Sequence, residues 1–120
     1  MEKIIEVGGR EVKFKATGAT PIHYRNLFRR DFLSEMQKLV DEKEAIDADE
    51  KSQFSISSLE SFENIAYIMA RSGAGNPPDF PASPEEWLDG FDMFNIYEIL
   101  PQIIELWGIN QQTLSQRKKK

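Results

Sequence analysis

Apolar and charged residues alternate over residues 4–15 of the chain. The apolar positions that share one side of this pattern are Ile5, Val7, Val12 and Phe14. Gly8-Gly9 separates the two runs, and a two-residue turn there would set Val7 opposite Arg10. A Gly-Gly pair in this place predicts a β-hairpin, because the tight turns of hairpins need positive φ angles. An isolated hairpin is only marginally stable, so we expect its apolar side to pack on the helices that follow.

From Thr20-Pro21 to about Glu44, apolar residues recur every three or four positions, which predicts one amphipathic helix. Thr20 is the predicted cap and Pro21 the first helical residue. The predicted apolar stripe consists of Tyr24, Leu27, Phe28, Phe32, Met36, Leu39 and Val40. The stretch from about Asp41 to Gln53 is acidic, and we expect a solvated, mobile connection there.

Capping signals predict two further helices. Ser57 and Glu60 form a capping box for the second helix, and Gly73 suits a left-handed residue at its end. The predicted buried side of this helix consists of Leu59, Phe62, Ile65, Ala66 and Met69. Residues 74–81 contain three prolines and should form a loop. A short third helix is expected to begin at Ser83-Pro84 and to end near Gly90.

Residues 91–107 are apolar on nearly all sides of a helix. We expect a helix here that is broken near Pro101 and stopped by Gly108, because proline lacks the N–H of a helical bond. A small domain buries such a helix only at its centre; otherwise part of the helix forms an interface. The predicted fold is α+β and mainly α, with the hairpin packed on about four helices. Residues 1–114 would form one domain, and residues 115–120 a disordered basic tail.

Composition supports a single soluble globular domain: 120 residues, 40% hydrophobic, 29% charged and without cysteine. No stretch approaches the roughly 18–20 apolar residues of a membrane span. The net charge of −5 is uneven, since residues 79–105 hold seven acidic and no basic residues. Such a chain repels phosphates, so we expect no binding to nucleic acid.

The sequence offers no pattern for catalysis, a cofactor or a metal. His23 is the only histidine and there is no cysteine partner. Glu85 and Glu86 are explained by the first turn of a helix, where negative charge is favourable; a hydrolase built on them is a remote alternative. Candidate partner-binding residues are instead Phe80, Trp87, Phe91, Phe94, Tyr97 and Trp107, with Arg25 and Arg29. The alternative is that the aromatic residues fill the core and that the arginines form a solvated face.

Several segments carry a family resemblance through their order and spacing: residues 5–12 (IEVGGREV), 20–25 (TPIHYR), 87–91 (WLDGF), 95–107 (NIYEILPQIIELW) and 107–110 (WGIN). With these segments the chain resembles the tail assembly chaperones of long-tailed, siphovirus-type phages and prophages of Gram-positive bacteria. The resemblance covers nearly the whole chain, and it carries no active-site residues.

The resemblance implies a non-enzymatic protein of the host cytoplasm that is absent from the mature virion. Such a chaperone binds the tape measure protein, keeps it soluble and helps the major tail (tube) protein to polymerise around it. It also implies self-association and a longer second product made by programmed frameshift, and Lys118-Lys119-Lys120 lie where such a slip occurs. A structural virion component, such as a tail or head-tail connector subunit, is the alternative.

Overall fold

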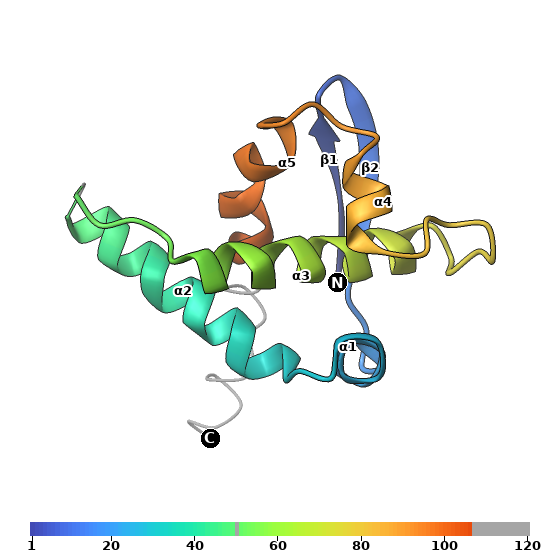
Figure 1. The fold of residues 1–120 in the computed structure, drawn as a ribbon, viewed down its shortest axis with the longest axis horizontal. Coiled ribbons are helices and arrows are strands. Elements are labelled where there is room, and N and C mark those ends of the chain that lie inside the picture. The colour runs from blue at the N-terminus through green and yellow to red at the C-terminus, as the bar shows by residue number, and fades with distance from the viewer. Residues whose placement is uncertain (50, 107–120) are drawn as a thin grey trace.

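The hairpin forms as predicted in the computed structural model, which describes residues 1–49 and 51–106. Strand β1 (Glu2–Val7) pairs antiparallel with β2 (Arg10–Lys15), and Val7 lies opposite Arg10 (Figure 1). The turn residues Gly8 and Gly9 have φ angles of 59° and 83°. The predicted apolar side faces the core, where Ile5, Val7 and Phe14 are buried and Val12 is half-buried.

The helix predicted from Thr20 to Glu44 is two helices, so that prediction was wrong. Helix α1 (Thr20–Phe28) ends at Arg29, which has a φ of 58°, and α2 (Phe32–Ala48) begins after Asp31. The Asp31 carboxylate accepts a hydrogen bond of 2.9 Å from the Ser34 N–H and caps α2. The three- and four-residue spacing of apolar side chains continues through the break, which is why periodicity alone hides it.

The start of α1 and the length of α2 also differ from the prediction. Ala19 occupies the cap position of α1, and Thr20 is the first helical residue, whose hydroxyl accepts the Thr17 N–H. The connection expected from Asp41 is helical as far as Ala48. Side-chain pairs one turn apart support this part of α2, because Lys43 binds Asp47 at 2.9 Å.

Helix α3 (Ile56–Gly73) is the central element, and Figure 1 shows it crossing the molecule with most of the hairpin on one side and α1 and α2 on the other. Its cap is Ser55, not the predicted Ser57, because the Ser55 hydroxyl accepts the Ser58 N–H at 3.1 Å. Every residue from Ile65 to Ala70 is buried. The predicted buried side is therefore too narrow, since α3 is covered on more than one side.

Gly73 ends α3 for a different reason from the one predicted. The positive φ angles lie at Gly75 and Asn76, whereas Gly73 is the last helical residue. A Cβ atom on Gly73 would lie 1.8 Å from the backbone oxygen of Lys13. The missing side chain therefore lets β2 pack directly on α3.

The C-terminal part combines a loop over residues 74–81 with three helical segments. Helix α4 (Pro84–Leu88) starts at the predicted cap Ser83. The single broken helix predicted for residues 91–107 is wrong at its start, since residues 91–94 are not helical and α5 (Asn95–Glu98) follows them. A turn at Ile99 then precedes helical residues 100–106, so the break lies near Pro101 as expected.

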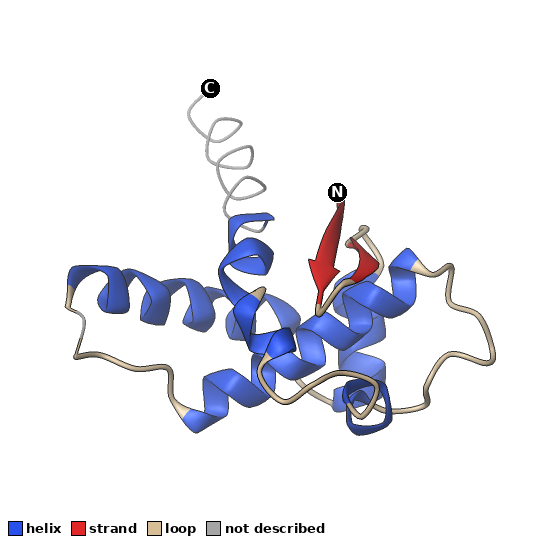
Figure 2. Ribbon diagram, turned by 90° about the horizontal axis from the view of Figure 1, so that it is seen from above, coloured by secondary structure: helices blue, strands red, loops and turns tan. Residues whose placement is uncertain are grey.

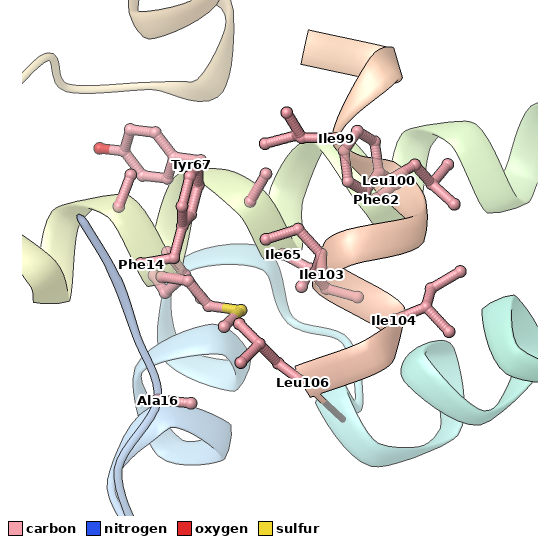
Figure 3. Close-up of a cluster of buried hydrophobic side chains, with 14 of the residues drawn as sticks. Phe14, Ala16, Phe62, Ile65, Tyr67, Ile99, Leu100, Ile103, Ile104 and Leu106 are labelled. Atoms are coloured by element: carbon pink, nitrogen blue, oxygen red, sulfur yellow. The ribbon is translucent and has the colours of Figure 1, made fainter. Parts of the chain in front are cut away.

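The core joins this C-terminal segment to α3 and the hairpin. Figure 3 shows the side chains of Ile99, Ile103 and Leu106 directed toward those of α3 and β2. The buried residues from these elements include Phe14, Phe62, Ile65, Ile99, Leu100, Ile103 and Leu106. The described chain is thus an α+β, mainly α fold with six helical segments, where about four were expected. Trp107, Gly108 and the predicted tail 115–120 lie outside the described residues.

Candidate partner-binding groove

A groove of about 690 Å³ lies between α4, the turn at residues 91–94 and α5. Glu63 of α3 also contributes to its wall. The apolar residues that line it are Leu88, Phe91, Met93, Ile96 and Tyr97. The groove therefore offers apolar side chains as well as polar ones to another molecule.

Helix α4 is held in place by its cap and by one buried ring. The Ser83 hydroxyl accepts the Glu86 N–H at 3.2 Å, while the Glu86 carboxylate accepts the Ala82 N–H at 3.1 Å. Trp87 is 6% exposed, and its ring makes edge-on contacts with Phe14 and Phe91 at centroid distances of 6.4 and 5.2 Å. Trp87 thus fixes one wall of the groove from inside the core.

The charged residues that line the groove are acidic. Four acidic residues line the groove: Glu63, Glu85, Asp89 and Asp92. No Lys or Arg is among the described residues that line it. The Arg10 guanidinium stacks on the Phe91 ring at 4.1 Å and lines two neighbouring hollows, one of them together with Asp92. Apolar and acidic side chains in one groove favour a partner that is apolar and basic.

Tyr97 and Glu63 connect α5 to α3 inside this groove. The Tyr97 hydroxyl donates a hydrogen bond to Glu63. This bond and the partial burial of the ring raise the pKa of Tyr97 to about 12. The phenol stays protonated at neutral pH, so the bond holds α5 against α3 and gives the groove a defined wall.

Two apolar side chains stand exposed beside the groove. Met93 is 72% and Phe94 66% exposed, and both lie on the turn before α5. Met93 was not among the predicted residues, because the candidates were chosen from aromatic residues and arginines. Exposed aromatic and methionine side chains next to a groove are typical of protein-binding surfaces.

The structure separates the other predicted residues. Phe91 and Tyr97 are half-buried in the groove, whereas Trp87 belongs to the core, as the alternative interpretation held. Phe80 is half-buried against Tyr67, with ring centroids 5.7 Å apart. Arg25 and Arg29 are exposed, and Figure 1 shows α1 on the other side of α3 from α5. Trp107 lies outside the described residues.

Residues 1–49 and 51–106 contain no group of three or more His, Cys, Asp or Glu side chains that could hold a metal ion. Across the same residues no helix has the length and apolar character needed to cross a membrane. The groove is lined mainly by the segments that follow α3 in the chain. Figure 1 shows these segments on the same side of α3 as most of the hairpin, and Figure 2 shows the small hairpin beside the helices from a second direction. Compared with known proteins, the chain matches no family model, no curated protein and no solved structure.

Proposed function

We propose that this chain is a tail assembly chaperone of a long-tailed phage or prophage. It binds the tape measure protein in the host cytoplasm, keeps it soluble and aids polymerisation of the major tail protein around it. The role is one of binding without catalysis. Support comes from the family resemblance of the sequence and from one structural observation, the apolar groove with Met93 and Phe94 exposed beside it.

The groove suits this role because it can cover the apolar side of a tape measure protein. The resemblance implies a long, largely helical partner whose apolar stripe aggregates when it is left uncovered. An apolar groove can receive one face of such a helix, and many weak contacts along the length of the partner add up to stable binding. The acidic groups around each groove would keep the covered partner in solution.

Co-expression tests the proposal. A tape measure protein encoded beside this chain should be mainly soluble with the wild-type chain and should aggregate without it. The variant Met93→Ser/Phe94→Ser should lose most of this effect, because it removes the two exposed apolar side chains. Ile56→Ser is the matched control, since Ile56 is 86% exposed but lies at the start of α3, away from the residues that line the groove.

Two results would count against the chaperone role. One is equal solubility of the tape measure protein with and without this chain. The other is abundant peptides of this chain in purified virions, which would favour a structural component of the particle. Mass spectrometry of the particles separates the two roles, because a chaperone is expected only in the cell lysate.

A further inference from the structure

An occupant of the groove has to match both apolar and acidic side chains. The apolar ones include Leu88 and Ile96 in the lining, and Met93 and Phe94 stand exposed beside it. The lining also has four acidic residues and no described Lys or Arg. A segment that carries apolar and basic side chains close together in sequence therefore fits the groove.

One stretch of this chain has that composition. Residues 107–120 contain no acidic residue, and Arg117 to Lys120 are four consecutive basic residues. Elsewhere in the sequence no more than two basic residues follow one another. Leu114 lies three positions before Arg117, so an apolar side chain accompanies the charge. We call residues 107–120 the tail segment; they lie outside the described residues.

The acidic residues of the groove are available for these cations. Glu85, Asp89 and Asp92 form no ion pair with another described residue. The other acidic surface, on the second half of α2, is partly neutralised, because Lys43 binds Asp47 at 2.9 Å. The groove thus offers three carboxylates that are not already paired with a described cation.

The tail segment is long enough to reach the groove of its own chain. Leu106 lies ten residues after Ile96, and most residues between them are helical. A helical rise of about 1.5–2 Å per residue sets the two about 15–20 Å apart. An extended chain covers about 26–29 Å from Leu106 to Leu114 and about 36–40 Å from Leu106 to Arg117. Both residues therefore come within reach of the groove.

We propose that the tail segment occupies the groove of its own chain when no partner is bound. Leu114 lies against the apolar side chains, and Arg117 to Lys120 lie against the acidic ones. Because the segment is tethered, its effective concentration is on the order of a millimolar, so a weak contact is enough to fill the groove. The partner then has to displace the tail segment, and this regulation of the groove rests on the proposed function.

A spin label reports where the tail segment lies in the intact chain. The sequence has no cysteine, so Ser115→Cys provides a single attachment site for a nitroxide. With the label oxidised, the amide NMR signals of Asp89, Met93 and Ile96 should fall to less than half of their intensity with the label reduced. The signal of Ile22 should keep its intensity, because α1 lies on the other side of α3 from α5 (Figure 1).

Charge variants of the labelled chain test the cause of the contact. Glu85→Lys/Asp89→Lys in the groove should restore most of the lost intensity, and so should Glu at positions 118–120 in place of the three lysines. The two sets of changes combined in one chain should broaden the groove signals again. This recovery distinguishes a lost contact from a lost fold.

Asp41→Lys/Glu44→Lys is the matched control for the groove variant. Both residues are exposed on α2 and lie outside the lining of the groove. The control makes the same change in charge, so it should leave the groove signals as broad as in the labelled chain without charge changes. A control that restores the intensity as fully as the groove variant would show that only net charge matters, and would overturn the proposal.

A mixture of two samples shows whether the contact lies within one chain. Isotope-labelled chains without a nitroxide are mixed with unlabelled chains that carry it, so that only contacts between copies broaden the signals. The groove signals should keep their intensity in this mixture. Broadening of the groove that appears as strongly in the mixture, broadening that is strongest on α2, or no broadening of the groove at all would overturn the proposal.

Co-expression with the tape measure protein separates this proposal from the proposed function. The chain with Glu at positions 118–120 should still keep the partner soluble, because its groove is open, whereas Glu85→Lys/Asp89→Lys should do so less. If the spin label places the tail segment in the groove but no chain affects the partner, only the proposed function fails. If the wild type solubilises the partner while the label never broadens the groove, only the occupation by the tail segment fails.

Discussion

The packing of β2 on α3 can be tested at a single glycine. A Cβ on Gly73 would lie 1.8 Å from the Lys13 oxygen and 2.6 Å from its carbonyl carbon. Both atoms belong to the backbone of β2, so a rotamer change cannot relieve the contact. In the Gly73→Ala variant the strand or the end of the helix has to move by more than an ångström.

The expected loss in Gly73→Ala follows from two opposing effects. Overpacking of this kind costs about 1–3 kcal/mol. Alanine in place of glycine inside a helix returns at most about 1 kcal/mol, and less at a last helical residue. We therefore expect the free energy of unfolding to fall by about 1–2 kcal/mol, which lowers the midpoint of urea unfolding by about 0.5–1 M.

Gly18→Ala is the control for this experiment. No atom lies within 4 Å of a Cβ placed on Gly18, and its φ angle is not in the left-handed region. Its unfolding midpoint should stay the same or rise slightly, because alanine restricts the unfolded chain. If Gly73→Ala proved as stable as Gly18→Ala, the close approach of β2 and α3 would be refuted.

Three other predictions concern the polar contacts around the groove and α3. Ser83→Ala removes the cap of α4 and should lower the free energy of unfolding by about 1 kcal/mol, measured in urea. Burial raises the pKa of Glu42, but hydrogen bonds from serines at the start of α3 outweigh it and leave that pKa below its ordinary value. The stability that these bonds contribute is present above the unfolded pKa of about 4.3 and is lost as the pH falls through the lower folded value. Glu42→Gln should therefore flatten the dependence of the melting temperature on pH in this acidic range; an unchanged pH dependence would contradict the assignment. Glu63→Gln should move the ionisation of Tyr97 from a pKa of about 12 toward the ordinary value of about 10, as followed by ultraviolet absorbance, and a step still near pH 12 would contradict it.

The hairpin could be predicted in full because its determinants are local. The Gly8-Gly9 turn fixes which residues face each other, and alternation fixes which side is buried. The break after α1 could not be found by periodicity, since Tyr24 and Phe32 keep helical spacing across it. Their rings meet edge-on at 5.5 Å, so the core accepts both helices on one apolar side. The cap residue Asp31 was the available signal, and it was missed.

The groove depends on contacts between distant parts of the sequence. The sequence predicts a helix over residues 91–94, but α5 begins only at Asn95. The turn of the hairpin lies close to Asn95. A Cβ on Gly8 would lie 2.2 Å from the Asn95 side-chain nitrogen. The tip of the hairpin thus packs on the start of α5, and the preceding turn leaves Met93 and Phe94 exposed. No local pattern carries this information, because the two residues come from opposite ends of the chain.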